Sequence, residues 1–334
     1  MKFFLCLLLL SLSLPGISQN INSKMNGISF VGTRKLISSS NLVPVEKINA
    51  NWITVMPFAF IPKGTAKVQY NQNFQWSGET VSGIEHTIKL AKQKNLKILL
   101  KPHIWMHYSW IGDLTFDTED EWMTFEETYT NYILEFAKLS EKLSIEVFCI
   151  GVEVKKIVIE RPNFWFELIG KVREVYTGKI TYAANWDNYQ HVKFWSKLDY
   201  IGIDAYFPIS DAKTPSYQAC YIGWKTHYEA IKTLSKAANK KVIFTEFGYR
   251  NIDFTGKEPW TESSNQTFNS MAQENAYRAI FSRFWGENWF AGGFLWKWFP
   301  DHQNTGGLKN NRFTPQNKPV QKIIKHFYGS GIEP

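Results

Sequence analysis

The sequence predicts a single (β/α)8 barrel of the TIM type, an α/β fold in which eight parallel strands close inside a ring of helices. Short runs rich in Val, Ile, Phe or Tyr alternate with longer stretches of helical periodicity over most of the chain. The 334 residues, 44% hydrophobic and 20% charged, are enough for eight such units. Connections after the runs are longer than those before them, as in barrels whose site lies at the carboxyl ends of the strands.

Residues 1–18 are expected to be a secretory signal peptide and not part of the barrel. Lys2 precedes the apolar run 3–10, and Pro15 and Ser18 follow it at a site of small residues. The run is shorter than the ~20 apolar residues that a membrane span needs. We therefore expect a mature (β/α)8 domain of residues 19–334, without a membrane span, that is secreted or periplasmic.

Eight short apolar runs are the predicted strands, because they are rich in the β-branched and aromatic residues of buried parallel strands. They cover residues 27–32, 52–60, 97–103, 146–154, 179–186, 200–206, 241–249 and 291–298. An open, doubly wound sheet is the alternative architecture. It is disfavoured in its dinucleotide-binding form because no Gly-x-Gly-x-x-Gly motif follows the first run.

Helices are predicted between these runs from the spacing of apolar residues. Ile84, Ile88 and Ala91, for example, recur at helical spacing with lysines on the opposite face. The predicted helices cover residues 79–95, 119–143, 163–176, 216–239, 271–285 and 315–328. The segment 191–198 leaves room for only a short helix.

Aromatic residues make up 16% of the chain, and many fall in the predicted loops after the strands. Flat rings with polar edges suit sugar-binding clefts, so Trp105 is predicted to bind substrate. The net charge of +8 comes from scattered Lys and Arg, a pattern that does not indicate nucleic acid. Cys149 and Cys220 are too few for a disulfide scaffold. We expect a monomer whose partner is an oligosaccharide or polysaccharide.

The fourth run ends in an acidic residue. Alternation of side chains along a strand predicts that Phe148, Ile150 and Val152 face the helices, and that Glu153 points into the barrel. A carboxyl group among apolar neighbours is costly to bury unless it has a function or a partner. A salt bridge at the mouth of the barrel is the alternative role for such a residue.

The seventh run carries a second glutamate near its end. Alternation separates Ile243, Thr245 and Phe247 from Phe244 and Glu246, and places Glu246 inside the barrel. Strands four and seven lie nearly opposite in an eight-stranded barrel, so the two carboxyl groups can converge. Facing carboxyl groups suit glycosidic cleavage, in which one protonates the leaving oxygen and the other attacks the anomeric carbon.

Four motifs carry a resemblance to a known family. They are KPHIW at residues 101–105, CIGVEV at 149–154, YIGIDAYFP at 200–208 and FTEFGYR at 244–250. With glutamates at the ends of strands four and seven, the chain resembles the clan A glycoside hydrolases, which are retaining enzymes. Within that clan it is similar to glycoside hydrolase family 113, known for β-1,4-mannanases, over most of residues 27–328.

The resemblance implies that Glu153 is the acid/base and Glu246 the nucleophile of a β-1,4-mannan hydrolase, and the predicted signal peptide makes it a secreted one. Electrostatics agrees with this division, because an ionised Glu246 nearby disfavours a second charge and keeps the proton on Glu153. The chain departs from the clan at Val152, where most members have an Asn that contacts the sugar 2-hydroxyl. We predict that Asn185 or His103 supplies this contact instead.

Three more inward residues are candidates from their places at strand ends. Tyr206 can hydrogen-bond the nucleophile, as a strand-six Tyr often does in the clan that this chain resembles. Asp204 is predicted to form an ion pair with Lys101, with sugar binding as the alternative. Trp296 can form the floor on which a sugar ring stacks.

Other functions are kept as alternatives. The same mechanism on another β-linked hexose or amino-sugar glycan is one, and a barrel that binds glycans without cleaving them is a second. A metal-dependent hydrolase is a third, since His103 and His107 are four residues apart. No His-Glu-x-x-His motif is present, however, so we expect neither a metal nor a cofactor.

Overall fold

The computed structural model describes residues 24–107, 109–261 and 267–330. The predicted signal peptide, residues 1–18, lies outside the described residues. Within the described ranges, no helix has the length and apolar character that crossing a membrane requires.

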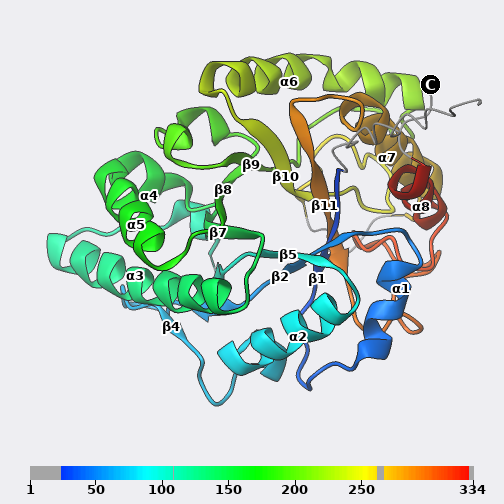
Figure 1. Cartoon of the computed structure of the whole chain (residues 1–334). Coiled ribbons are helices and arrows are strands. Elements are labelled where there is room, and N and C mark those ends of the chain that lie inside the picture. Colours follow the sequence, from blue (N-terminus) through cyan, green and yellow to red (C-terminus); the bar gives the residue numbers. More distant parts are fainter. Residues whose placement is uncertain (1–23, 108, 262–266, 331–334) are drawn as a thin grey trace, which may run out of the picture.

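Eight parallel strands close into a barrel with helices around it, which confirms the predicted fold class (Figure 1). Their bounds are β1 Met25–Phe30, β2 Trp52–Val55, β5 Lys97–Leu100, β7 Val147–Val152, β8 Lys179–Asn185, β9 Tyr200–Asp204, β10 Lys241–Phe247 and β11 Phe290–Trp298. Each strand overlaps one predicted run and pairs with its neighbours in this order, and β11 pairs with β1 to close the barrel. The strand order therefore follows the chain order, as repeated β-α units require.

The six long helices lie close to their predicted positions. They are α2 Val81–Gln93, α3 Glu119–Lys142, α5 Pro162–Val175, α6 Tyr217–Ala238, α7 Ser270–Phe284 and α8 Val320–Ser330. The short helices α1 Val43–Glu46 and α4 Lys155–Glu160 were not predicted. Helix α8 begins later than expected because Asn317, at φ 56°, has a left-handed backbone that a helix cannot contain.

Local chemistry explains where the longest helix begins and which face it buries. Thr118 and Glu121 form a reciprocal capping box at the start of α3. Beyond it, Phe125, Tyr132 and Phe136 recur at helical spacing and are buried. This apolar face packs α3 on the outside of the barrel.

Apolar side chains fill the structure in two layers. The smaller cluster draws on strands all round the barrel and forms its interior: Met25, Trp52, Leu99, Val147, Cys149, Val152, Ala183, Ile243 and Phe294. The larger cluster lies between the strands and the helices. Because the interior is packed, the described residues leave room for a site at the two ends of the barrel and not along its axis.

One expectation from strict alternation is wrong on β7. The pairing of β7 with β8 shifts register between Cys149 and Val152. As a result Val152 lies in the barrel interior together with Cys149, and not against the helices. Glu153 follows β7 with a left-handed backbone at φ 52°, and its side chain lines the cavity at the strand ends, as its predicted inward direction requires.

Strand β10 has a similar irregularity between Phe244 and Glu246. Phe244 was grouped with Glu246 but packs outward, its ring 4.8 Å from that of Phe284 in α7. Thr245 was grouped with the outer residues but donates a hydrogen bond to Asp204 inside the barrel. Glu246 itself points inward, as predicted, because the bulge adds one residue to the inner face.

A second, three-stranded sheet extends two of the barrel strands outward. It contains β3 Phe58–Phe60, β4 Gln69–Tyr70 and β6 His103–Trp105, in the order β4-β3-β6. The sequence predicted single runs at 52–60 and 97–103, but Pro57 and Pro102 divide them. Proline cannot donate to the ladder, so each run contributes one strand to the barrel and one to this accessory sheet.

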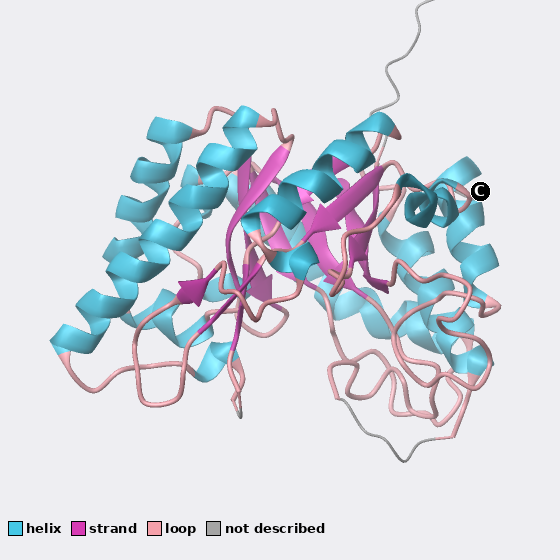
Figure 2. Ribbon diagram, turned by 90° about the horizontal axis from the view of Figure 1, so that it is seen from below, coloured by secondary structure: helices cyan, strands magenta, loops and turns pink. Residues whose placement is uncertain are grey.

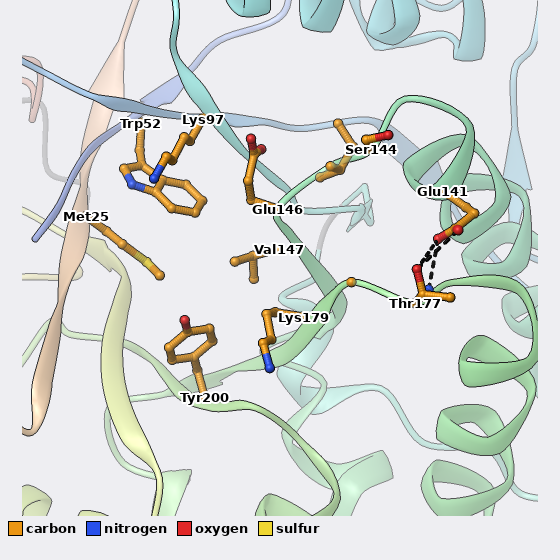
Figure 3. A pocket seen from close by; sticks show the side chains of 12 residues that line it. Met25, Trp52, Lys97, Glu141, Ser144, Glu146, Val147, Thr177, Lys179 and Tyr200 are labelled. Atoms are coloured by element: carbon orange, nitrogen blue, oxygen red, sulfur yellow. Dashed lines mark hydrogen bonds between the residues drawn. The ribbon is translucent and has the colours of Figure 1, made fainter. Parts of the chain in front are cut away.

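The two ends of the barrel differ. Long connections that follow the strands lie together at the lower side in Figure 2. At the opposite end, a cavity of ≈ 470 Å³ is lined by residues that begin strands, among them Met25, Trp52, Lys97, Val147 and Lys179 (Figure 3). In barrels of this type the amino-terminal end serves stability, and reactive sites lie at the carboxyl ends of the strands.

We predict that α2 can be destabilised through its one close backbone approach. A Cβ on Gly83 would lie 1.7 Å from the Ser77 carbonyl oxygen. Gly83→Ala should therefore lower the free energy of unfolding by roughly 1–3 kcal/mol in urea titrations.

Gly170 in α5 is the matched control, because a Cβ there meets nothing within 4 Å. Gly170→Ala should stabilise the protein by roughly 0.5–1 kcal/mol. Equal effects of the two substitutions would contradict the packing of α2 described above.

Candidate active site

A cavity of ≈ 570 Å³ opens at the carboxyl ends of the barrel strands. It is lined by Trp110, Glu153, Asn185, Trp186, Asp187, Tyr206, Glu246, Trp260, Trp296 and Phe313. Five of these residues were predicted from the sequence, and the fold brings them together from β7, β8, β9, β10 and β11 or the residues just after them. The cavity is therefore where the predicted site assembles.

Glu246 accepts two hydrogen bonds from buried donors. Lys101 Nζ lies 2.6 Å from its Oε1, and Tyr206 Oη lies 2.7 Å from its Oε2. Burial and the negative charge of Glu246 raise the pKa of Tyr206 well above its ordinary value, so the phenol stays a donor. The predicted bond from Tyr206 is thus present, and both oxygens of Glu246 are held in place by charge-assisted bonds.

Lys101 also pairs with Asp204, as predicted. Its Nζ lies 3.1 and 3.3 Å from the two carboxylate oxygens, and both side chains are 0% exposed. Burial opposes the charge of Lys101, but Asp204 and Glu246 together raise its pKa. Burial and then Glu246 raise the pKa of Asp204 to about 7, against the opposite effect of Lys101. The bond from Lys101 to Glu246 is what the sequence reasoning missed.

Glu153 follows β7, opposite Glu246. Its backbone N–H donates to the carbonyl of Ala183, which fixes the left-handed residue against β8. Desolvation, together with the charges of Asp204 and Glu246, raises the pKa of Glu153 to about 8. A hydrogen bond of 3.0 Å from Trp110 Nε1 lowers this pKa, but by less than the other effects raise it. At neutral pH the carboxyl group of Glu153 therefore carries a proton.

His103 begins β6 and sits between two rings. It lies 5.1 Å from Phe58 and stacks on Trp296 at 6.1 Å between ring centroids. Burial, Lys101 and Lys297 lower the pKa of His103 well below its ordinary value, so the imidazole is neutral. Its Nε2 has no hydrogen-bond partner among the described residues and lies 3.9 Å from Glu246 Oε1. His103, predicted to contact the sugar, is not among the residues that line the cavity, but it stacks on Trp296, which is.

Aromatic side chains form much of the remaining wall. Trp186 and Trp260 stack at 4.8 Å with an angle of 19° between their planes. Asn185 accepts from the Trp186 backbone and donates to Asp187, and so holds the turn that carries Trp186. The sequence signal for Trp110 and Trp260 was their place in long loops after strands, whereas nothing distinguished Trp186, Asp187 or Phe313.

Trp105, predicted to bind substrate, does not line this cavity. It ends β6 with 54% of its surface exposed and lines a separate groove on the accessory sheet. Among the described residues, no group of three or more His, Cys, Asp or Glu side chains is placed to hold a metal ion.

The fold and the site together define a class of enzyme. Two carboxyl groups face one cavity, one of them protonated near neutrality and the other bound by an ammonium and a phenol. Such a pair is what cleavage of a glycosidic bond needs. The protein is a glycoside hydrolase.

Comparison with known families agrees and is more specific. The sequence pattern of Glycoside Hydrolase Family 113 matches residues 34–318. The chain belongs to that family, which confirms the resemblance carried by its four motifs. Curated protein sequences yield no match.

Solved structures support the same assignment of fold. A family 113 β-mannanase from Alicyclobacillus acidocaldarius has a TM-score of 0.81 and 22% identity, over 92% of this chain and 98% of that one. A family 113 β-1,4-mannanase has a TM-score of 0.77 and 26% identity, over 92% and 99%. A β-glucuronidase from Ruminococcus gnavus has a TM-score of 0.62 and 12% identity, and the match covers half of its length.

Trp110 gives a test of the ionisation of Glu153. Trp110→Phe removes a hydrogen bond that favours the charged carboxylate, so the pKa of Glu153 should rise from about 8. If protonated Glu153 is the acid, kcat/KM falls as pH rises through this pKa, and the alkaline limb should move up by about one pH unit.

The pH dependence of kcat/KM for wild type and variant measures this shift. Trp260→Phe is the control, because Trp260 lines the same cavity and donates no bond to Glu153. A limb that stays in place in Trp110→Phe would show that Glu153 does not set it.

Proposed function

We propose that the protein is an exported enzyme that hydrolyses β-1,4-mannosidic linkages with retention of configuration. Glu153 acts as acid/base and Glu246 as nucleophile. The observation that carries the proposal is the contrast between the two carboxyl groups. One has a pKa raised to about 8 by desolvation and neighbouring charge, and the other accepts bonds from Lys101 and Tyr206.

In the first step a carboxylate oxygen of Glu246 attacks the anomeric carbon. The bond from that carbon to the leaving oxygen breaks as Glu153 transfers its proton to the oxygen. The products are a glycosyl ester on Glu246, an ionised Glu153 and the departing sugar alcohol. Lys101 then remains paired with Asp204 alone, so the ester forms without leaving the ammonium unpaired.

In the second step Glu153 takes a proton from a water molecule, whose oxygen attacks the same carbon. The ester bond breaks and its electron pair returns to Glu246 as a carboxylate. Lys101 and Tyr206 are placed to bind this carboxylate as its charge develops, which favours its departure. Glu153 ends protonated, ready for another cycle. Two displacements at one carbon retain its configuration.

The mannan substrate is supported by the similar structures and by the site. The family 113 structures with the similarities given above are described as β-mannanases. The sugar 2-hydroxyl is next to the carbon that Glu246 attacks, so a group beside Glu246 can contact it. His103 Nε2, buried and 3.9 Å from Glu246, is better placed for this contact than Val152, which packs in the interior.

Another β-linked hexose or amino-sugar glycan is the second candidate. It is favoured by Val152, because an apolar side chain provides no hydrogen bond where the clan has an Asn. For export, the proposal rests on the sequence of residues 1–18, whose basic start, apolar run and small-residue end fit a signal peptide.

Glu246→Gln tests the nucleophile and the substrate together. The amide keeps the shape of the side chain but cannot form the ester, so the variant should release no product from mannohexaose while still binding it. Mass spectrometry of residues 19–334 incubated with mannohexaose measures the products. Glu167→Gln, an exposed glutamate on α5, is the control and should match the wild type.

NMR of the first product formed by the wild type reports its anomeric configuration, and a β-anomer supports retention. An α-anomer would overturn the double displacement. If mannohexaose is untouched while another β-glycan is cleaved, the second candidate replaces mannan.

Lys101 tests the positioning of the nucleophile. Lys101→Met leaves Asp204 and Glu246 to share a buried space without their ammonium, so kcat should fall by about 100-fold and the acid limb should move to higher pH. Lys101→Arg keeps the charge and should recover part of kcat. The pH dependence of kcat, measured on variants with wild-type circular dichroism, separates this effect from loss of folding. An unchanged pH profile in Lys101→Met would exclude the role.

A further inference from the structure

The accessory sheet carries a row of rings, of which the proposed reaction uses only His103. In the parallel pairing of β3 with β6, Phe58 lies beside His103 and Phe60 beside Trp105. Side chains two residues apart on a strand point to the same face of a sheet. The four rings of Phe58, His103, Phe60 and Trp105 therefore lie on one face, in two adjacent pairs.

This face starts at the catalytic cavity. His103 lies 3.9 Å from Glu246 and stacks on Trp296, which lines the cavity. Trp105 follows two residues later, roughly 7 Å further along the strand. The row of rings thus leads outward from the nucleophile.

The outer end of the row opens into a groove of ≈ 440 Å³. Its lining includes Phe58, Phe60, Phe74, Trp76 and Trp105, with Gln75 and Glu79 beside them. Phe74 packs on Phe60 at 5.2 Å between ring centroids, yet 72% of its surface is exposed. Trp105 and Trp76 are 54% and 42% exposed. Large rings left exposed together mark a binding surface.

We propose that this groove, lined by Phe60, Phe74, Trp76 and Trp105, binds the glycan chain at sugar units beyond the one attacked by Glu246. The inference rests on the proposed function. The occupant is the same β-linked hexose chain, because the row of rings is continuous with the cavity in which the chain is cut. Pyranose rings present flat C–H faces that stack on aromatic rings, while their hydroxyls reach polar edges such as Gln75 and Glu79.

The position of the groove also bears on where the chain is cut. The groove extends from β2 and β5, whereas the stacked pair Trp186 and Trp260 follows β8 and β10 on the other side of the barrel mouth. A chain that occupies both sides passes over the carboxyl pair. Cleavage then falls inside the chain and favours substrates long enough to reach the groove.

Kinetics on substrates of different length test the groove. Trp105→Ala and Phe74→Ala should raise KM for mannohexaose by about three- to tenfold, with kcat little changed. For an aryl β-mannoside, which is too short to reach the groove, kcat/KM should change less than twofold. Trp105→Tyr should recover most of the loss. Phe166→Ala removes a partly exposed ring on α5 and is the control.

Binding without cleavage separates the groove from the proposed function. In the Glu246→Gln background, retardation in native gels that contain galactomannan, glucomannan or mixed-linkage β-glucan measures affinity for each polymer. The Glu246→Gln variant is the parent protein in this experiment. If adding Trp105→Ala or Phe74→Ala weakens retardation by a polymer that the parent binds, the result supports the groove as a glycan-binding site. If that polymer is not a mannan, the mannan assignment fails and the groove stands.

Three results would overturn the groove proposal. One is equal retardation of the parent and the groove variants, which would leave the proposed function intact. Another is a parent that binds none of the polymers, which would count against both proposals. The third is a change of sedimentation coefficient on Phe74→Ala, which would assign the groove to contact between copies of the chain.

Discussion

The site depends on one ammonium group placed inside a barrel. Lys101 follows the third barrel strand, is 0% exposed, and is shared by Asp204 and Glu246. A buried charge of this kind is tolerated only with partners, and removal of one partner of a buried pair costs about 3–5 kcal/mol. The carboxyl groups of Glu153, Asp204 and Glu246 lie near this single ammonium, so they cannot all be ionised at once. The pKa values of Glu153 and Asp204 are raised, and a proton is therefore retained within this group of carboxyls.

The fold could be predicted from the sequence because barrel strands buried on both faces are apolar runs, and helices with one buried face repeat every three to four residues. Where the predicted bounds of strands and helices were wrong, single residues determined the observed bounds. Pro57 and Pro102 divided two runs between different sheets, and Asn317 delayed α8. The bulges in β7 and β10 could not be predicted, since an extra residue in a strand leaves no mark in its apolar pattern.

The same distinction applies to the site. Residues at strand ends, such as Glu153 and Glu246, could be found because alternation and fold place all strand ends at one mouth. Strict alternation of side chains predicted that both glutamates point into the barrel. The bulges interrupt this alternation, but each adds a residue to its strand, so both glutamates still point inward. Loop residues such as Trp110 could be suspected as aromatic but not assigned to Glu153, since sequence does not give the path of a loop.

The separation of the ion-pair partners along the chain has a consequence for biosynthesis. Lys101 emerges from the ribosome 103 residues before Asp204 and 145 residues before Glu246. A lysine without a counter-charge does not enter an apolar interior. The nascent amino-terminal half therefore has to keep this end of its strands hydrated until β9 and β10 are made. Closure of the barrel interior is then a late event in which the nucleophile and its cation are buried together.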